Sequence, residues 1–212
     1  MSGERFDVVI VGGGMVGASL ACALAAGGGF ARVALLEGFP LLERNGPAVY
    51  QPSFDARSTA LALSSAQFLE RIGLWAAVRR HAQPIRRIHV SDRGRFGSTV
   101  MDAAGEGLEA LGYVVENQWL GNVLHDGLRA CANLTLLAPA RAEAVRRVAD
   151  GVRVRASLAH GEQTLELTAG LVVIADGARS GLAAALGIHA GQQDYGQQAL
   201  IANVAHRAPH EG

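Results

Sequence analysis

The feature that most constrains the fold is the stretch from Val8 to Gly29, VVIVGGGMVGASLACALAAGGG, which has no charged side chain. Its length alone would suit a membrane-spanning helix, which needs about 20 apolar residues. The stretch is rich in glycine, however, and glycine lowers helix propensity over any window of that length. The preceding residues, MSGERFD, carry two acids against one arginine, unlike the positively charged start of a secretion signal. We therefore divide the stretch into a buried strand, a tight turn and a helix.

The turn contains the pattern G-x-G-x-x-G, formed by Gly12, Gly14 and Gly17 directly after the expected strand. The first glycine permits a sharp turn, the second lets a pyrophosphate approach the backbone, and the third lets helix and strand pack closely. Met15 and Val16 begin the helix, whose free amides and positive dipole end would meet the phosphates. The turn therefore predicts a phosphate-binding site.

An acidic residue stands where such a site needs one. Residues 32–37, RVALLE, form the next apolar run, and the run ends at Glu37, about 20 residues after Gly17. A carboxylate at this position accepts hydrogen bonds from both ribose hydroxyls and disfavours a 2′-phosphate. The spacing predicts a dinucleotide site on a right-handed strand–helix–strand unit.

Composition excludes several other classes of function. The 212 residues carry 19 basic and 19 acidic side chains, and no lysine occurs, so a basic nucleic-acid surface is not expected. Cys22 and Cys131 fall within apolar helical patterns, which favours buried free thiols in a reducing cytoplasm. There is no HExxH motif, no His/Cys cluster with metal-ligand spacing and no G-x-S-x-G elbow. We therefore expect no metal ligand and no catalytic nucleophile.

Downstream, the chain alternates between apolar helices and short strands. We expect Asp55 to cap a helix with Leu61, Phe68 and Ile72 on its apolar face. Short alternating pieces separated by glycine between residues 85 and 113 predict antiparallel strands in a second sheet. The other expected elements are a helix at 118–132, a strand at 134–137, a hairpin or meander at 145–167, a buried strand at 171–175, a short helix, and an alternating segment at 198–207.

Two further stretches match motifs of the class A flavoprotein aromatic monooxygenases: DARSTAL at residues 55–61 and IADGARS at 174–180. Together with IHVSDRG and YVVENQWLGNVL, they make the chain resemble the ubiquinone-biosynthesis hydroxylases of that family over nearly its whole length. The resemblance implies FAD as the cofactor and NAD(P)H as the reductant. A resident metal is not part of what it implies.

The resemblance also implies a fold and a domain organisation. We expect an α/β fold with a Rossmann-like FAD-binding domain of the GR2 type, similar to that of para-hydroxybenzoate hydroxylase, and part of a second, mainly antiparallel substrate sheet. The FAD-binding domain is placed at residues 1–83 and 114–190. The partial substrate sheet is placed at residues 84–113 and 191–212.

Site residues follow where positions match the family motifs. Gly12, Gly14, Gly17 and Glu37 would hold the ADP half of FAD. The ten cofactor-binding residues expected in all are Gly12, Gly14, Met15, Val16, Gly17, Glu37, Arg57, Gln118, Asp176 and Gly177.

Beyond the ADP half, each matched residue has an expected role and a simpler alternative. Arg57 would reach the phosphate or ribityl region, and Gln118 would contact the ribityl chain; the alternatives are ordinary residues at helix starts. Asp176 and Gly177 would serve both FAD and NAD(P)H, with a plain turn as the alternative. Arg179 is a candidate contact to nicotinamide-cofactor phosphates, or else a solvated arginine at a helix end.

In this family the flavin carries out the chemistry, through a C4a-hydroperoxide that hydroxylates an electron-rich phenol. The resemblance therefore implies a lipid-soluble polyprenylated phenol and molecular oxygen as substrates. His89, Asp92 and Arg93 are interpreted as solvent-facing strand residues rather than catalytic groups. Another FAD- or NAD-linked oxidoreductase, or a non-catalytic nucleotide-binding or assembly subunit, stays open as an alternative.

Members of the family continue beyond this length. Their third motif, Gly-Asp followed by a His- and Pro-containing stretch, binds the ribityl chain, and no Gly-Asp dipeptide occurs in the 212 residues. We therefore expect an amino-terminal portion of a longer hydroxylase that folds at least partly, binds FAD weakly and does not turn over alone. We expect a bacterial cytoplasmic location, with contact to the inner membrane or to a ubiquinone-biosynthesis complex compatible with such a substrate.

Overall fold

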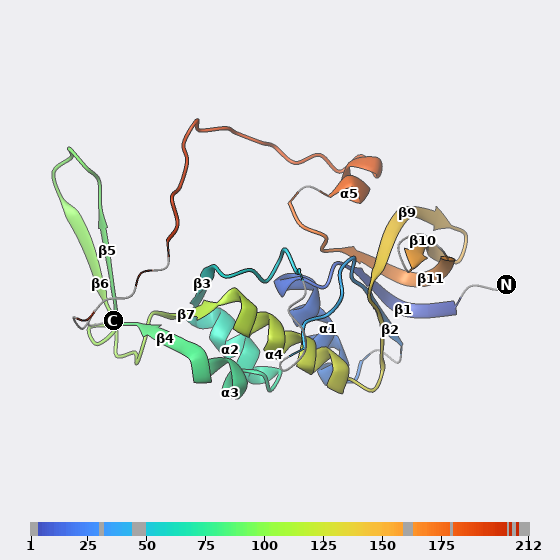
Figure 1. Cartoon of the computed structure of the whole chain (residues 1–212), viewed down its shortest axis with the longest axis horizontal. Coiled ribbons are helices and arrows are strands. Elements are labelled where there is room, and N and C mark those ends of the chain that lie inside the picture. The colour runs from blue at the N-terminus through green and yellow to red at the C-terminus, as the bar shows by residue number, and fades with distance from the viewer. Residues whose placement is uncertain are drawn as a thin grey trace. The chain divides into compact units, whose positions relative to one another are not determined.

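The computed structural model describes residues 4–29, 32–43, 50–158, 163–178, 180–202, 204 and 207. By its internal contacts the chain divides into two compact units (Figure 1). Unit 1 comprises Met1–Phe54 and Gly121–Gln198, and unit 2 comprises Asp55–Leu120 and Ala199–Gly212. These boundaries differ from the domain limits expected from the sequence. The assignment of a cofactor domain and a substrate sheet stays a prediction.

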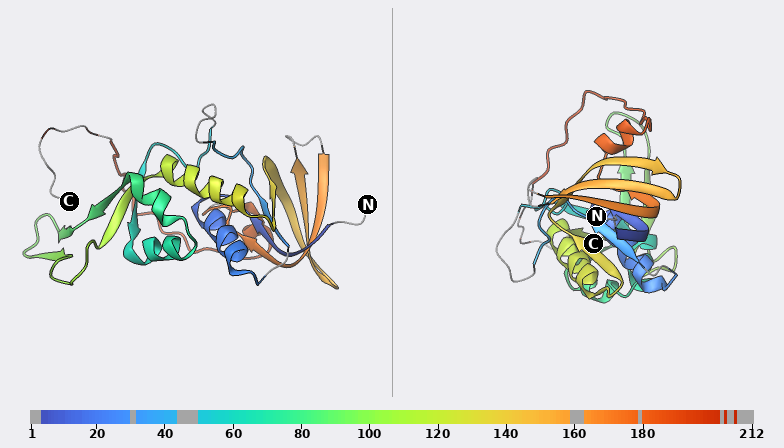
Figure 2. Two further views of the ribbon diagram at one scale, coloured as in Figure 1. Left: turned by 90° about the horizontal axis from the view of Figure 1, so that it is seen from below. Right: turned by 90° about the vertical axis from the view of Figure 1, so that its right-hand side faces the viewer.

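Unit 1 is built on a six-stranded mixed sheet with the order β8-β2-β1-β11-β10-β9. Its first four strands run parallel, whereas β10 pairs antiparallel with both β11 and β9. The left view of Figure 2 shows β9, β10 and β11 side by side. The strands are β8 (Leu134–Leu137), β2 (Val33–Leu36), β1 (Glu4–Val11), β11 (Gln163–Ile174), β10 (Gly151–Leu158) and β9 (Ala140–Val148).

The glycine-rich stretch forms the strand, turn and helix expected from the sequence. Strand β1 is followed by α1 (Met15–Gly27) and then by the parallel strand β2. The β-branched residues Val8, Val9 and Ile10 are almost fully buried, as in a central parallel strand covered on both faces. Helix α1 is followed by its C-cap Gly28, whose φ of 64° is the left-handed conformation common at helix ends.

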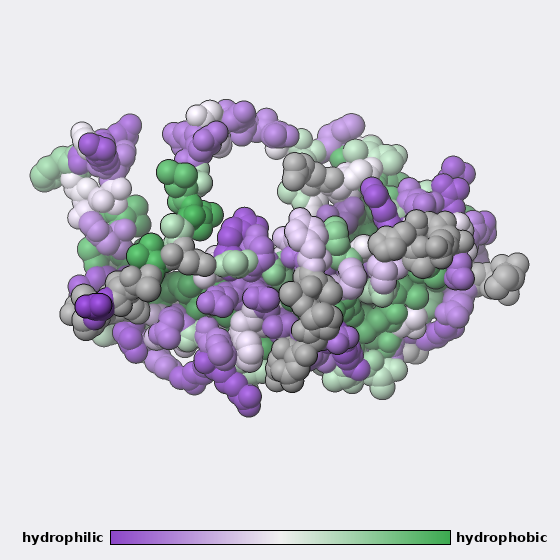
Figure 3. Space-filling view, in the orientation of Figure 1, coloured by the Kyte–Doolittle hydropathy of each residue, from purple (hydrophilic) through white to green (hydrophobic). Residues whose placement is uncertain are grey.

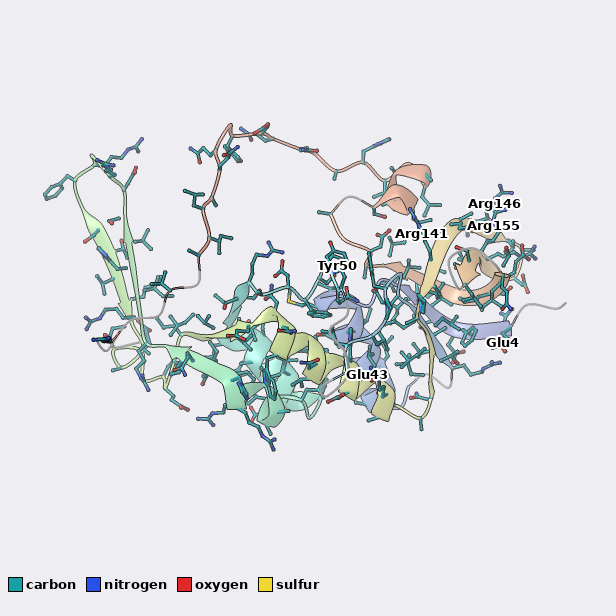
Figure 4. All side chains as sticks on the ribbon, in the orientation of Figure 1. Glu4, Glu43, Tyr50, Arg141, Arg146 and Arg155 are labelled. Atoms are coloured by element: carbon teal, nitrogen blue, oxygen red, sulfur yellow. The ribbon has the colours of Figure 1, made fainter. Side chains whose placement is uncertain are left out.

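The antiparallel part of the sheet has several exposed arginine side chains. Arg141, Arg146 and Arg155 lie on β9 and β10 (Figure 4), and hydrophilic patches stand beside hydrophobic ones at this end of unit 1 on the face seen in Figure 3. The Arg155 Nε lies 3.3 Å from the Glu143 carboxylate. Nearby acids thus offset part of the positive charge.

Unit 2 contains two small antiparallel sheets, as the alternating sequence pattern predicts. One has the order β3-β7-β4, and the other pairs β5 with β6. An edge-to-face contact between Trp75 and Tyr113 packs the short helix that begins at Trp75 against the first sheet. The elements are β3 (Ser58–Ala62), α2 (Leu63–Arg71), α3 (Trp75–Val78), the 3₁₀ helix η1 (Arg79–His81), β4 (Ala82–Ile85), β5 (Arg87–Ser91), β6 (Ser98–Asp102) and β7 (Gly112–Glu116).

Helix α4 (Asn117–Ala130) runs from unit 2 into unit 1, where the short helix α5 (Gly181–Ala185) also lies. The residues that the helical spacing places on the apolar face of α4, including Leu124 and Leu128, are buried. Its apolar face supplies part of the packing of unit 1. No helix in the parts of the chain that the structure describes is long and apolar enough to cross a membrane.

Three local expectations were wrong. Asp55 caps no helix: residues 58–62 form β3, paired with β7, and α2 begins only at Leu63, because pairing with a partner strand overrides the helical pattern. The expected separate strands at 145–167 and 171–175 are joined, since β11 continues to Ile174. Among the described residues after Ala185 there is no further helix or strand, so the alternating segment at 198–207 does not form the expected strand there.

Candidate cofactor-binding site

The carboxyl ends of three parallel strands place the motif residues of unit 1 at one edge of the sheet. Val11 at the end of β1 is paired with Leu36 of β2 on one side and Ile174 of β11 on the other. The next residues along the chain are Gly12, Glu37 and, after Ala175, Asp176. Strands β2 and β11 flank β1 on opposite sides, and such a switch point is where open α/β sheets bind ligands.

The first and third glycines of the motif are required by packing. Gly12 has φ of 102°, and a Cβ there would lie 2.4 Å from the Ala175 carbonyl oxygen. A Cβ on Gly17 would lie 1.9 Å from the Gly12 carbonyl oxygen. The turn thus lies directly against the backbone that leads from β11 to Asp176, and the helix lies directly against the turn.

The amino end of α1 is open to a ligand. Its N-cap is Gly14, which has no side chain to accept a hydrogen bond from the first turn. The first intrahelical bond runs from the Ala18 N–H to the Gly14 carbonyl at 2.9 Å. Val16 is 72% exposed although it is apolar. Helix amides without a side-chain cap, together with the helix dipole, suit an anion at this end of the helix.

Glu37 lies beside the turn and is nearly buried, with 6% of its surface exposed. Its Oε2 accepts a hydrogen bond from the Gly13 N–H at 2.6 Å, and its Oε1 accepts one from the Phe39 N–H at 2.9 Å. The Gln51 side-chain amide also donates to Oε1, at 3.4 Å. A carboxylate held next to the glycine turn suits ribose hydroxyls, so these residues fit the ADP half of a dinucleotide.

Two buried polar residues at this site were missed by the sequence reasoning. Gln51 contacts Glu37, and His125 of α4 accepts a hydrogen bond from the Leu42 N–H at 2.8 Å while its other ring nitrogen lies 3.4 Å from the Gly13 carbonyl oxygen. Burial lowers the pKa of His125 below its ordinary value. A signal for His125 was present, because it interrupts the apolar face of α4 between Leu124 and Leu128.

Arg57 and Gln118 lie in unit 2. The Arg57 Nε donates to Asp55 Oδ2 at 2.6 Å, and the Arg57 backbone N–H donates to Asp55 Oδ1 at 3.0 Å. The buried Asn117 side chain donates to the same Oδ1 at 3.3 Å. The backbone bond to Arg57 is the main reason that the pKa of Asp55 is lowered. Asp55, a helix cap in the sequence interpretation, therefore holds Arg57 in place instead.

The remaining residues singled out in the sequence have simple surroundings. Asp176 and Gly177 follow β11 and are exposed, and Gly177 has φ of 98°. His89 is exposed on β5, and Asp92 and Arg93 are exposed after it, as expected for solvent-facing residues. Arg179 lies outside the described residues. In the part of the chain that is described, no group of three or more His, Cys, Asp or Glu could hold a metal ion.

Cys22 and Cys131 are both free thiols, as expected. Cys22 is buried, and burial, together with the neighbouring Cys131, raises its pKa to about 12. Cys131 is only partly buried, a difference from the sequence expectation, because it follows the last turn of α4. Its thiol donates to the Gly127 carbonyl at 3.2 Å.

The chain is similar to FAD-binding proteins and to ubiquinone-pathway hydroxylases. A family model described as FAD binding domain matches residues 5–211. The ubiquinone hydroxylase UbiL of Rhodospirillum rubrum is 39% identical over 206 residues, which cover 97% of this chain and 45% of that protein. The 3-demethoxyubiquinol 3-hydroxylase of Escherichia coli is 34% identical over 213 residues, which cover 96% of this chain and 49% of that protein.

Among solved structures, p-nitrophenol 4-monooxygenase PnpA of Pseudomonas putida superposes with a TM-score of 0.69 and 26% identity, over 87% of this chain and 44% of that one. The chain spans about half the length of the curated relatives that it matches.

Proposed function

The chain belongs to the FAD binding domain family, and from this membership we propose that it provides the cofactor site of an FAD-dependent monooxygenase that hydroxylates a polyprenylated phenol in ubiquinone biosynthesis. The observation that carries the proposal is the meeting of Gly12, Glu37 and Asp176 at the carboxyl ends of β1, β2 and β11. Two relatives named as ubiquinone-pathway hydroxylases support the choice of substrate class.

The residues of unit 1 have distinct roles in this proposal. The backbone amides of Met15, Val16 and Gly17 bind the diphosphate at the amino end of α1. Glu37 accepts hydrogen bonds from the ribose hydroxyls. Asp176, which lies next to Gly12, and Gly177 after it line the cofactor's side of the same sheet edge.

In the proposal, Arg57 and Gln118 have the roles that the family motifs imply. Arg57 binds the phosphate or ribityl region, since its Nε–H is held by Asp55 and a guanidinium has further N–H donors. Gln118 contacts the ribityl chain. Asn117 fixes Asp55 from α4, and so holds Arg57 indirectly.

When bound and reduced by NAD(P)H, FAD would supply the activation of molecular oxygen, which protein side chains alone do not provide. Overall, one oxygen atom enters the phenol ring and the other leaves as water, with NAD(P)H as the two-electron donor. The protein binds and orients the ring and excludes water. The residues given roles in the two preceding paragraphs bind the cofactor, and none of them forms a covalent bond in the reaction.

The first experiment is a titration of the purified 212-residue chain with FAD, followed by flavin fluorescence and absorbance. FMN, which lacks the AMP portion of FAD, and NAD⁺, which has no 2′-phosphate, are the comparison ligands. We expect FAD to bind and FMN to bind far more weakly, because the unit 1 site is built for a diphosphate and a ribose. Preference for a nicotinamide nucleotide over FAD would contradict the proposed cofactor and favour another oxidoreductase.

The second experiment measures oxygen uptake after NAD(P)H and a short-chain prenylated phenol are added. Phenol-dependent oxygen uptake, with the hydroxylated phenol as product, supports the monooxygenase. We expect weak FAD binding and no turnover from the 212 residues alone, and turnover from a chain with the length of the relatives. Stoichiometric flavin and phenol-dependent turnover by the 212 residues would overturn the expectation that they are inactive alone. FAD binding without turnover at full length would favour a non-catalytic subunit.

A further inference from the structure

His125 is buried in unit 1, with no exposed surface, although it lies on the apolar face of α4. Its ring meets the Phe54 ring edge to face, with centroids 5.1 Å apart and an interplanar angle of 89°. Phe54 itself packs where Gly121 leaves room, since a Cβ at Gly121 would lie 2.4 Å from the Phe54 Cγ. The imidazole is therefore fixed in orientation by aromatic packing as well as by hydrogen bonds.

The hydrogen bonds of His125 determine which nitrogen carries its proton. The Leu42 N–H is a donor only and lies 2.8 Å from Nδ1, so Nδ1 is the acceptor and bears no proton. In the neutral ring the proton is then on Nε2, which donates to the Gly13 carbonyl oxygen at 3.4 Å. The charged ring, with protons on both nitrogens, would set a donor against the Leu42 N–H.

The Gly13 carbonyl belongs to the peptide unit that carries the Gly14 N–H. Because this unit is planar and trans, its C=O and N–H point in opposite directions. A carbonyl held by His125 therefore directs the Gly14 N–H away from α4. At the same time the Gly13 N–H is held by Glu37 at 2.6 Å, so the chain at Gly13 is fixed on both sides.

We propose that His125 is a positioning residue for the cofactor: its neutral Nε2–H form holds the Gly13–Gly14 peptide so that the Gly14 N–H is presented to the diphosphate of FAD. This inference rests on the proposed FAD site and adds a residue to it. His125 does not touch the cofactor and acts through the backbone of the turn.

The same side chain holds the segment after β2. Leu42 donates its N–H to His125, and its carbonyl accepts a hydrogen bond from the Arg129 Nη2 at 2.6 Å. Both peptide groups of Leu42 are thus bound by side chains of α4. The charged groups that face His125 are Glu37, Asp126 and Arg129, while burial favours the neutral ring and lowers its pKa.

The test compares wild type, His125→Phe and a matched control, Leu128→Ala. Phenylalanine keeps a ring against Phe54 but removes both hydrogen bonds. Leu128 is fully buried on the same helix and its side chain has no polar group, so its truncation lowers stability without removing a hydrogen bond from the turn. We expect His125→Phe to raise the Kd for FAD about 10-fold, the equivalent of one buried hydrogen bond, and Leu128→Ala to leave it within about 2-fold.

A pH series separates positioning from a general structural role. In wild type and in Leu128→Ala, the FAD affinity should fall as the pH drops through the pKa of His125, because a proton on Nδ1 then faces the Leu42 N–H, displaces the ring and so weakens its Nε2–H bond to Gly13. In His125→Phe this part of the pH dependence should disappear. In the protein without FAD, ¹⁵N NMR should show His125 protonated at Nε2 and not at Nδ1.

The outcomes distinguish the two proposals. If wild type does not bind FAD, the proposed function fails at that step. If wild type binds FAD and His125→Phe binds it equally well with the same pH profile, the positioning role of His125 is wrong. An Nδ1–H tautomer in the NMR spectrum would overturn it as well.

Discussion

Replacing Glu37 by glutamine tests how much the hydrogen bonds of this carboxylate contribute to the stability of the glycine turn. The carboxylate accepts hydrogen bonds from two backbone donors, the Gly13 N–H on Oε2 and the Phe39 N–H on Oε1. A glutamine amide has one oxygen, so in Glu37→Gln one of these N–H groups faces an NH₂ group. With 6% of Glu37 exposed, water has little access to compensate.

The expected loss of stability follows from the two backbone hydrogen bonds that the Glu37 carboxylate accepts. A hydrogen bond to a charged group contributes about 1.5–3 kcal/mol, and a buried donor without a partner costs about 1–3 kcal/mol. Because the second backbone bond and the Gln51 contact can rearrange, we expect a loss of about 2–3 kcal/mol in the free energy of unfolding of the protein without FAD. For a chain of this size that lowers Tm by roughly 5–10 °C.

Circular dichroism during heating and in urea measures this loss, with Glu166→Gln as the matched control. Glu166 is half exposed and lies 3.8 Å from Arg153, and an exposed ion pair of this kind contributes at most about 1 kcal/mol. Glu37→Gln should also weaken FAD binding, whereas Glu166→Gln should not. Equal Tm values for the two variants would refute the view that the Glu37 bonds hold the turn.

Four further outcomes are expected. Gly17→Ala should abolish FAD binding, because its Cβ would lie 1.9 Å from a backbone oxygen, whereas Gly27→Ala, with nothing within 4 Å of the added Cβ, should keep FAD binding; one titration compares them. The pKa of His125 is lowered on folding, so as the pH falls below about 6.5 the unfolded chain protonates this histidine before the folded chain does. Urea titrations below that pH should therefore show the free energy of unfolding decreasing by up to about 1.4 kcal/mol per pH unit. His125→Phe should lack this slope. Cys22, with its pKa raised to about 12, should resist alkylation at pH 8 in the folded protein and react in guanidinium, as mass spectrometry would show. Arg57→Ala should weaken FAD binding while changing Tm by less than about 2 °C, because its side chain is 57% exposed and its ion pair is at the surface.

The sequence predicts the nucleotide-binding core well because its signals are local. A strand, a turn and a helix within one short stretch are determined by β-branched residues, by glycines at fixed offsets and by small residues. Glu37 is predicted by its spacing from Gly17. The comparisons confirm the family and the fold, whereas the roles of the individual site residues stay predictions.

The sequence could not predict contacts between distant segments. The bonds of His125 join residues 83 and 112 positions apart, and nothing in either local pattern indicates them. Asp55 shows the converse error: a good local match to a helix cap lost to strand pairing between β3 and β7 and to the bond with Arg57. Local propensity decides only where no partner from elsewhere in the chain competes.

The buried polar groups around the turn, two of which were not predicted from the sequence, hold the turn in one conformation. Of the four buried polar or charged residues in the described chain, Glu37, Gln51 and His125 gather around the turn in unit 1, and each is hydrogen-bonded to another group of the protein. Keeping three polar side chains in a core is costly unless they are paired, so their convergence indicates a turn that is held in one conformation before it binds. A turn fixed in advance loses little entropy when a diphosphate arrives, which raises affinity. Substitutions that loosen the turn should therefore lower stability and FAD affinity together, while substitutions of exposed contacts should lower affinity alone.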